Sequence, residues 1–595
     1  MKPERRVLRG VPASHGMAVG PVKVLRHGAV VVPMRRIEPS EFDGEELRLR
    51  AAIDASRQEI ESVRDALEKA AGTDYGLILD AHLLMHRDEL VVDGAVRAIR
   101  EEGVNAEWAL RRTIDDLKRR LGSAGAAYFQ DRALDVEHVG QHILRWLMGA
   151  ATPCPPIDAS TILVCDDLTP ADAAKFLDSP VIALVTELGS AASHTAILAR
   201  TLEIPAVVGV TGVMEHVVDD DVIVVDALHG LVVLEPDRAE RFRAQERARR
   251  YQAFLQGLRS KREAAVETKD GERVCLQANV EFPAEAPLAI DAGADGIGLY
   301  RTEFLFLDRP SPPSEDEQAE VYSQIVRVMN PRTVTFRTYD LGGDKLPGSS
   351  QLARSPNPAL GLRALRLSLA MPELFEEQLR AILRASCDGP TRLMFPLVSN
   401  VDELRRARAI VARVVEELRF EGTAVPDVPV GIMVEVPSAA LVADVLAREC
   451  EFFSVGTNDL IQYTLALDRT NPQVAYLARP LEPAILRLLD MVSRAARAHG
   501  IDLAMCGDMA ADPFALPVVV GLGYRNLSMA YASIPLAREV LGRIDSARAH
   551  EVAAMALECD SADSVHRLVL EHFSGALGDL WIEEGLELEA VTGVD

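Results

Sequence analysis

Residues 428–459 read VPVGIMVEVPSAALVADVLARECEFFSVGTND, and this stretch predicts one strand–helix–strand unit. Two apolar runs, Val428–Val434 and Phe452–Val455, are strand candidates, and a helical pattern separates them. Glu435 comes directly after the first run, and the pair Asn458-Asp459 follows the second. In a parallel α/β fold such residues lie at the carboxyl ends of the strands, where these folds build their sites.

The same alternation of strand and helix continues through the C-terminal half of the chain. Eight apolar runs are strand candidates: Val274–Val280, Gly296–Tyr300, Thr333–Thr338, Arg392–Val398, Val428–Val434, Phe452–Val455, Leu503–Met505 and Asn526–Ser528. The clearest helical pattern between them is Val401–Phe420. Eight strands alternating with helices over about 300 residues predict a (β/α)8 barrel. An open doubly wound sheet is the alternative, and we favour the barrel because polar residues follow nearly every strand.

The N-terminal part of the chain is organised differently. Short extended runs such as Pro21–Leu25 and Val30–Val32 come first, and a long helical region follows. Strand-like runs then return at Thr161–Cys165, Val181–Thr186, Ala206–Val210, Val222–Val225 and Leu231–Leu234. We therefore expect a multidomain α/β protein with a helical bundle inserted near the start of a small α/β domain. The expected boundaries are 1–34 and 151–236 for the α/β domain, 35–150 for the inserted helical domain, 237–269 for a helical linker and 270–595 for the barrel.

Composition places the chain among soluble globular proteins. It has 595 residues, of which 48% are apolar and 26% charged, and its formal net charge of -26 disfavours nucleic-acid binding. Its seven cysteines form no C-x-x-C pair, so neither a zinc site nor a disulfide framework is indicated. The N-terminus lacks the apolar segment of a secretory signal, and no apolar run approaches the ~20 residues that span a bilayer. We expect a cytoplasmic protein.

Charged residues gather after the predicted barrel strands and in the loops beyond them. They are Arg301, Arg337, Asp340, Lys345, Arg363 and Arg469. Several arginines that face one cavity repel each other unless a polyanion neutralises them, and the guanidinium fork suits carboxylate and phosphate. Glu435 and Asp459 add two carboxylates, which with phosphate oxygens and water make a typical magnesium shell. The pattern predicts a site for a small, doubly anionic, phosphorylated molecule.

Each of these residues also has a simpler interpretation when it is taken alone. A single arginine after a strand is more often a surface ion-pair partner. The pair Asn458-Asp459 could cap a turn or a helix, and Cys506, in AMCGD after the seventh strand, could be an inert buried thiol. We favour the site because five strand ends would otherwise carry such residues by accident.

One histidine stands out in the N-terminal part. Residues 189–200 read GSAASHTAILAR, so His194 follows a run of small residues and begins an apolar helical stretch. Small neighbours leave room for a ligand, and the first turn of a helix favours a negative group. Imidazole is also a competent nucleophile near neutral pH. The alternative is a histidine packed in the core.

Two other motifs are set aside. His82 and His86 have the spacing of a metal pair on a helix, but the glutamate of H-E-x-x-H is missing, so we expect them on a helix surface. The chain has no G-x-x-x-x-G-K-[ST] motif and no complete dinucleotide loop, so an ATP site is not indicated.

The chain resembles enzyme I of the phosphoenolpyruvate-dependent phosphotransferase system from end to end. The most specific match is EFFSVGTNDLIQYTLALDR at residues 451–469. GIGLYRTEFLF at 296–306, FRTYDLGGDK at 336–345 and AMCGD at 504–508 are nearly as specific, and the match begins with GVPASHGMAVGPV at residue 10.

The resemblance implies a role for each candidate residue. His194 would take the phosphoryl group in a swivelling phosphohistidine domain, and Cys506 would protonate the enolate carbon to give pyruvate. Phosphoenolpyruvate would be bound by Arg301, Arg337, Arg363, Asn458, Asp459 and Arg469. Glu435 and Asp459 would bind Mg²⁺. The inserted domain, a four-helix bundle in this family, would dock the phosphocarrier HPr, and the barrels would join a homodimer.

Two features depart from the family pattern. Ser190 and Ala192 stand where the family usually has Gly or Ala and a Ser, Thr or Asn, and Asp508 stands where Glu is usual. Neither removes a reacting group, but both bear on rate and on partner choice.

Three other functions remain open at this point. One is an ATP-dependent phosphoenolpyruvate synthase or dikinase, although residues 1–150 are too short and too helical for its ATP-binding region. Another is a scaffold that senses phosphoenolpyruvate without transferring phosphate. The third is the nitrogen-branch paralogue of enzyme I, which commonly carries an additional sensory domain.

Overall fold

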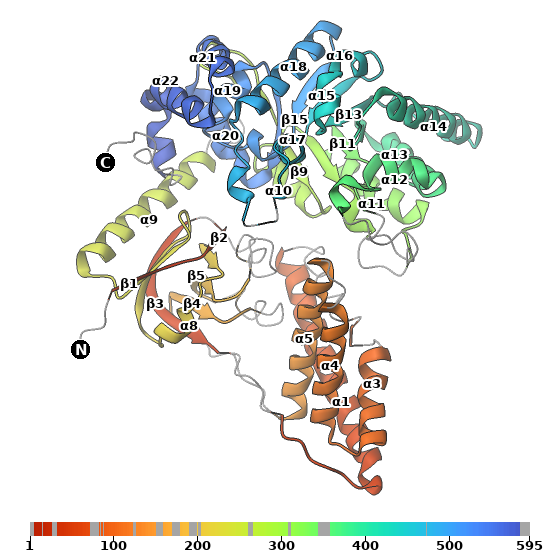
Figure 1. Cartoon of the computed structure of the whole chain (residues 1–595), viewed down its shortest axis with the longest axis vertical. Coiled ribbons are helices and arrows are strands. Elements are labelled where there is room, and N and C mark those ends of the chain that lie inside the picture. The colour runs from red at the N-terminus through yellow and green to blue at the C-terminus, as the bar shows by residue number, and fades with distance from the viewer. Residues whose placement is uncertain are drawn as a thin grey trace. The chain divides into compact units, whose positions relative to one another are not determined.

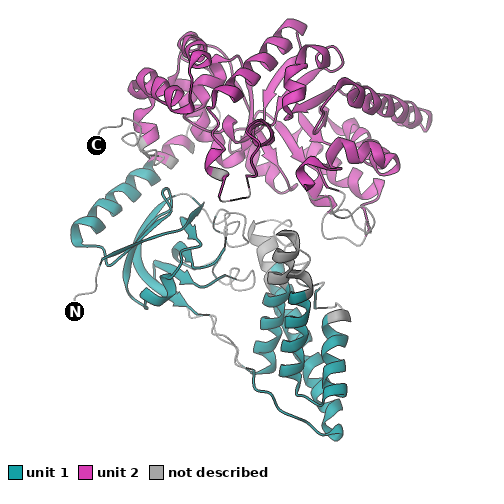
Figure 2. Ribbon diagram, in the orientation of Figure 1, with its two compact units in different colours: residues 1–253 teal, residues 254–595 magenta. Residues whose placement is uncertain are grey.

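The computed structural model describes most of the chain, and Figure 1 shows its elements. The described residues are 5–583 except 15, 27–31, 72–82, 84, 87–88, 123–126, 150–156, 158, 169–175, 177–178, 190–198, 200–203, 260–265, 307–310, 343–356, 470 and 472. They form two compact units, residues 1–253 and 254–595 (Figure 2). The predicted residues His194, Ser190, Ala192, Lys345 and His82 lie outside the described residues.

A closed barrel of parallel strands forms the centre of the second unit. Its strands are β9 (Cys275–Val280), β10 (Ile297–Arg301), β11 (Val334–Arg337), β12 (Thr391–Phe395), β13 (Val430–Val434), β14 (Phe452–Val455), β15 (Asp502–Met505) and β16 (Asn526–Ala530). They pair in sequence order, and β16 pairs with β9 to close the barrel. This confirms the predicted barrel and excludes the open doubly wound sheet.

Helices surround the barrel (Figure 1). They are α10 (Glu285–Asp291), α11 (Glu315–Met329), α12 (Ala364–Ala370), α13 (Pro372–Ala385), α14 (Val401–Phe420), α15 (Pro437–Leu441), α16 (Ala443–Leu446), α17 (Thr457–Thr464), α18 (Pro483–His499), α19 (Leu516–Gly521), α20 (Ile534–Arg543), α21 (Ser546–Glu558) and α22 (Ala562–Glu583). Helix α14 shows why they form. The Asn400 side chain accepts hydrogen bonds from the N–H groups of Asp402 and Glu403, and Leu404, Val411 and Leu418 are buried at helical spacing. The predicted bounds of this helix are confirmed.

The first unit contains a mixed sheet. Its strands are β1 (Arg6–Arg9), β2 (Val11–Ser14), β3 (Met17–Leu25), β4 (Thr161–Cys165), β5 (Val181–Thr186), β6 (Ala206–Val208), β7 (Val222–Asp226) and β8 (Leu231–Leu234), in the order β1-β8-β7-β3-β4-β5-β6-β2. The short helix α8 (Val213–His216) packs on it, and α9 (Arg238–Arg259) follows it in the chain. Of the predicted strand Val30–Val32, only Val32 is among the described residues, and it belongs to no strand.

The helical region of this unit is inserted between neighbouring strands. β3 and β4 pair in parallel, from Val22 beside Ile162 to Leu25 beside Cys165, although the helices lie between them in the sequence. The helices are α1 (Phe42–Ala71), α3 (Glu89–Glu102), α4 (Ala106–Gly122) and α5 (Ala127–Leu147). Apolar side chains from all four form one core, which includes Leu49, Ile99, Leu110 and Ile143.

The expectation that His86 lies on a helix surface is wrong. His86 is 2% exposed, and its Nε2 lies 2.7 Å from the Oγ of Ser56. The buried His86 ring therefore has a polar partner, the Ser56 hydroxyl on α1. The same hydroxyl also lies 2.6 Å from Nδ1 of His142. No helix among the described residues is long and apolar enough to cross a membrane.

Candidate active site

The predicted site residues of the barrel meet at one rim. Arg301 ends β10 and Arg337 ends β11. Glu435 follows β13, Asp459 lies in the first turn of α17 after β14, and Cys506 follows β15. Because the strands are parallel, their carboxyl ends lie on the same side of the barrel, where sites of this fold are built.

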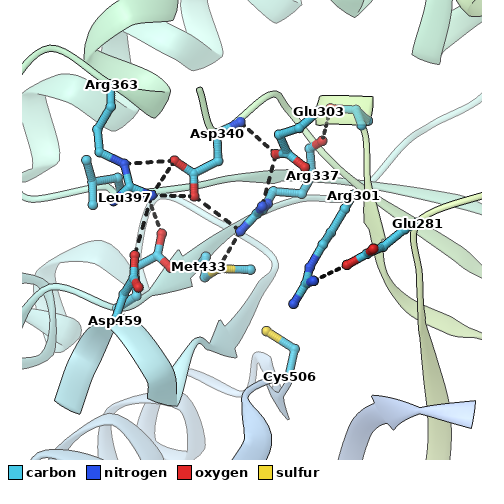
Figure 3. Close-up of polar contacts among 12 residues, drawn as sticks. Glu281, Arg301, Glu303, Arg337, Asp340, Arg363, Leu397, Met433, Asp459 and Cys506 are labelled. Atoms are coloured by element: carbon cyan, nitrogen blue, oxygen red, sulfur yellow. Dashed lines mark hydrogen bonds and ion pairs between the residues drawn. The ribbon is translucent and has the colours of Figure 1, made fainter. Parts of the chain in front are cut away.

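Arg337 is the centre of a buried ion-pair network (Figure 3). Its Nη2 lies 2.9 Å from Oε1 of Glu303, and its Nη1 lies 3.4 Å from Oδ2 of Asp340. The Arg337 side chain is only 11% exposed. Burial alone lowers the pKa of this guanidinium, but the charges of Glu303, Asp340 and Glu435 outweigh it and raise the pKa above its usual value. Arg337 is therefore held as a cation.

The network continues through alternating charges to the start of α17. Nη2 of Arg363 lies 2.8 Å from Oδ1 of Asp340 and 3.5 Å from Oδ2 of Asp459. Nη2 of Arg469 donates a hydrogen bond of 2.7 Å to Oδ1 of Asp459. Charges from three separate loops thus lie in one continuous chain, with Glu303 at one end and Arg469 at the other.

Glu435 is a buried carboxylate beside this chain. It is 2% exposed, and its Oε1 accepts a hydrogen bond of 2.6 Å from the N–H of Leu397. Burial, with the charges of Asp340 and Asp459, raises the pKa of Glu435 well above its usual range. Carboxylates crowded in this way favour a cation nearby. Among the described residues no group of three or more His, Cys, Asp or Glu side chains is placed to hold a metal ion. Glu435 and Asp459 still fit Mg²⁺, which usually takes one or two carboxylates together with substrate phosphates.

Cys506 and Arg301 lie at the other side of the site. The head group of Arg301 points toward the thiol, and it forms an ion pair with Glu281 (Figure 3). Cys506 is 4% exposed and belongs to a small apolar cluster that includes Met394 and Phe452. Burial raises the pKa of its thiol to about 11, so the thiol keeps its proton at neutral pH.

Asn458 joins the loops after β14 and β15. Its Oδ1 accepts a hydrogen bond of 3.0 Å from the backbone N–H of Asp508. The Asp508 side chain is exposed, so this residue contributes its backbone to the site.

The sequence reasoning missed several partners of the site residues. Glu303 and Glu281 pair with Arg337 and Arg301, and Nδ2 of Asn279 donates a hydrogen bond of 3.0 Å to the carbonyl of Cys506. Glu281 and Glu303 each offer a signal, because Glu281 directly follows the predicted strand Val274–Val280 and Glu303 stands two residues after Arg301 in the segment LYRTEF.

Replacing Gly507 by alanine is expected to distort this site. A Cβ at Gly507 would lie 1.9 Å from Oγ1 and 2.6 Å from the backbone N of Thr457, the first residue of α17. Either Cys506 or the start of α17 must then move. We expect a loss of about 1–3 kcal/mol in the free energy of unfolding and about 100-fold in turnover. Thermal unfolding and pyruvate release would measure them. The control is Gly542→Ala, where nothing lies within 4 Å, and equal behaviour of the two variants would contradict the account.

Comparisons with known proteins agree with this arrangement. Residues 256–546 match the family model of the PEP-binding domain of PEP-utilising enzymes. Residues 9–132 match the model of their N-terminal region, and residues 157–230 match the model of their mobile domain.

Curated relatives match over nearly the whole chain. The phosphoenolpyruvate-protein phosphotransferase of Staphylococcus aureus (strain MSSA476) is 38% identical over 95% of this chain and 99% of its own length. The protein of the same name from Geobacillus stearothermophilus is 39% identical over 96% of this chain and 98% of its own length. The protein of that name from Lactococcus lactis subsp. lactis is 40% identical over 95% of this chain and 99% of its own length. The chain belongs to the phosphoenolpyruvate-protein phosphotransferase family.

Proposed function

We propose that this chain transfers the phosphoryl group of phosphoenolpyruvate to its own His194 and releases pyruvate. It then passes the group to the histidine of an HPr-like phosphocarrier, as the first step of a sugar phosphotransferase system. The observation that carries the proposal is the chain of paired arginines and carboxylates beside a protonated thiol at the barrel rim.

Substrate binding is assigned to the arginines of the rim. Phosphoenolpyruvate carries a carboxylate and a phosphate, and both match the guanidinium fork. Arg301, Arg337, Arg363 and Arg469 would bind these groups, with Asn458 and Asp459 beside them. Their present carboxylate partners hold the guanidinium groups in place before substrate binds.

Charge counting favours a divalent cation in this site. The described network holds four arginines against four carboxylates, Glu281, Glu303, Asp340 and Asp459, and the buried Glu435, whose raised pKa favours its protonated form, becomes a fifth negative charge when a cation binds beside it. An anionic substrate therefore needs further positive charge. Mg²⁺ held by Glu435 and Asp459 would neutralise charge on the phosphoryl oxygens when it is bound.

The transfer needs a nucleophile and a proton donor from this chain. The bond between phosphorus and the enol oxygen breaks as a ring nitrogen of His194 bonds to phosphorus, and the arginines stabilise the charge that spreads over the oxygens. The enolate left behind takes the proton of the Cys506 Sγ at its terminal carbon and becomes pyruvate. The thiolate then recovers a proton from water.

The proposed division of labour follows the sequence prediction. Residues 1–34 and 151–236 would form the phosphohistidine domain, 35–150 would dock the carrier, 237–269 would link the two parts, and 270–595 would bind phosphoenolpyruvate. The insertion of the helices between the paired strands β3 and β4 supports the first two assignments. The phosphohistidine domain would swivel between barrel and carrier, and the barrels would join a homodimer.

The direct test is to map the phosphoryl group. Incubation with phosphoenolpyruvate labelled on phosphorus and with Mg²⁺ is expected to give an acid-labile label on the peptide that contains His194, which moves to HPr when HPr is added. The control variant is His229→Ala, which removes another histidine of the N-terminal unit that pairs with Asp226. Its labelling should equal that of the unmodified chain. Label on another residue, or no release of pyruvate, would overturn the proposal.

A further inference from the structure

A buried glutamine outside the rim reaches two of the strand ends that carry the site. Gln378 lies on α13 and is 0% exposed. Its Nε2 donates hydrogen bonds of 3.0 Å to Oγ1 of Thr302 and 3.4 Å to the hydroxyl of Tyr322. Its Oε1 accepts a hydrogen bond of 3.0 Å from the backbone N–H of Tyr339. One amide therefore contacts the segments after β10 and β11 together.

The contacted residues are next to the charged groups of the site. Thr302 stands between Arg301 and Glu303, and Tyr339 directly precedes Asp340. Oγ1 of Thr302 also donates a hydrogen bond of 3.0 Å to the carbonyl of Arg337. Gln378 thus holds the Thr302 side chain on one side of the Glu303–Arg337–Asp340 cluster and the Tyr339 backbone on the other, and none of these bonds involves a charged side chain.

The hydrogen bonds around Gln378 allow one orientation of its amide. The Thr302 hydroxyl gives its proton to the Arg337 carbonyl, so it must accept from Gln378. The Tyr322 hydroxyl gives its proton to Oε1 of Gln318, so it accepts from Gln378 as well. The backbone N–H of Tyr339 needs an acceptor, which only the amide oxygen supplies. This position requires a donor and an acceptor together.

We propose that Gln378 is a positioning residue for phosphoenolpyruvate transfer. The pairing of β10 with β11 places Arg301 beside Arg337, and Gln378 fixes the segments just beyond these strand ends, Thr302 and Tyr339, which carry the carboxylates that orient the Arg337 guanidinium toward one substrate. The inference rests on the proposed function of that site. A misplacement of about 1 Å can cost about 100-fold in rate, and a bridge between two loops controls such a spacing.

The chain contains a matched control for this role. Gln318 on α11 is also 0% exposed, and it accepts from the same Tyr322 hydroxyl while its Nε2 donates 3.1 Å to the carbonyl of Pro313. It belongs to the same buried network but contacts neither strand end in these bonds. Gln318→Met and Gln378→Met therefore remove similar buried hydrogen bonds, and only the second removes the bridge.

The test compares these variants in the whole 595-residue chain. Pyruvate formed in a single turnover is measured against phosphoenolpyruvate concentration with Mg²⁺, which gives a maximal rate and a half-saturating concentration, and thermal unfolding is measured in parallel. We expect both methionine variants to lower the melting temperature. The rate constant at low phosphoenolpyruvate should fall about 10- to 100-fold in Gln378→Met, because the maximal rate falls and the half-saturating concentration rises. In Gln318→Met the same rate constant should fall less than about threefold.

A conservative variant separates positioning from folding. Gln378→Glu keeps the acceptor, and its protonated form also keeps a donor toward Thr302, while burial favours that neutral form. Each rate constant at low phosphoenolpyruvate is divided by that of the unmodified chain at the same pH. At pH 6 this relative rate constant should be at least about threefold higher in Gln378→Glu than in Gln378→Met. Equal activity losses in Gln378→Met and Gln318→Met, or no recovery in Gln378→Glu, would overturn the inference. Failure of the unmodified chain to release pyruvate would instead overturn the proposed function.

Discussion

Replacing Cys506 by alanine is expected to slow pyruvate formation by a factor of about 10² to 10⁴, the range for loss of a positioned general acid. The half-saturating concentration of phosphoenolpyruvate should stay within about threefold, because the proposed function assigns substrate binding to the arginines of the rim and not to the thiol. The variant separates the step that releases pyruvate from the step that binds substrate.

The structure explains why this thiol suits proton donation. Cys506 is buried, and its raised pKa of about 11 means that nearly every molecule carries the proton at neutral pH. An ordinary surface cysteine at the same place would be ionised more often. The Arg301 and Arg337 guanidinium groups near the thiol lower its pKa in part, which stabilises the thiolate that forms.

Single-turnover measurement of pyruvate by rapid quench would test this prediction. The control is Cys450→Ala, because Cys450 is also buried, its thiol pKa is also raised, to about 12, and its Sγ also donates to a backbone carbonyl, but it lies before the amino end of β14, whereas Cys506 follows the carboxyl end of β15. We expect Cys450→Ala to react at nearly the unmodified rate. Equal loss of rate and of substrate affinity in Cys506→Ala would argue against the role as acid.

The barrel could be predicted from the sequence because its signal is local. Each strand is a short apolar run, each is followed by a helix, and the residues Arg301, Glu435 and Cys506 end or directly follow their strands. Once the strands are known to be parallel, their ends must lie together. That single geometric rule placed most of the candidate site.

The partners within the site could not be predicted in the same way. Glu281 and Arg301 lie on different strand ends, and so do Glu303 and Arg337. Which carboxylate meets which arginine depends on strand register and side-chain direction, and a single sequence contains neither. Gln378 is a stronger example, because the helical spacing from Leu374 and Ile382 places position 378 on the buried face but does not say which groups its amide meets.

The missed strands have a physical reason as well. β1 has four residues, three of them exposed, so it shows no apolar run. β2 contains Pro12, which weakens the strand pattern, and it lies at the edge of the sheet. Edge strands depend on pairing with distant residues more than on their own composition.

Replacing Arg337 by methionine is expected to have a comparable effect on activity and a larger effect on stability. Removal of one preorganised charge from a transition state typically costs about 10² to 10³ in rate. Removal of one partner from a buried ion pair typically costs about 3–5 kcal/mol, because the remaining charge is left without compensation. The second description holds because Arg337 is the cation paired with Glu303, whereas Asp340 keeps Arg363 as a partner, and the first follows from the proposed role of Arg337 in binding phosphoenolpyruvate.

Single-turnover pyruvate formation and denaturant unfolding would measure the two effects. The control is Arg392→Met on β12, where the arginine is 31% exposed and pairs with the exposed Asp502. Exposed pairs contribute about 0–1 kcal/mol, so this variant should unfold and react almost as the unmodified chain does. A similar stability loss in both variants would contradict the buried-network account.

A double variant distinguishes the two roles of Arg337. In Arg337→Met with Glu303→Gln, the uncompensated carboxylate becomes a neutral amide, whose oxygen can still accept the N–H of Asp340 that Glu303 accepts now. Neutralising both members of a buried pair costs far less than removing one, so much of the lost stability should return. The phosphoryl transfer rate should not return, because no cation replaces the guanidinium at the end of β11. If activity recovered together with stability, Arg337 would be a structural residue and the rim would bind its substrate without it.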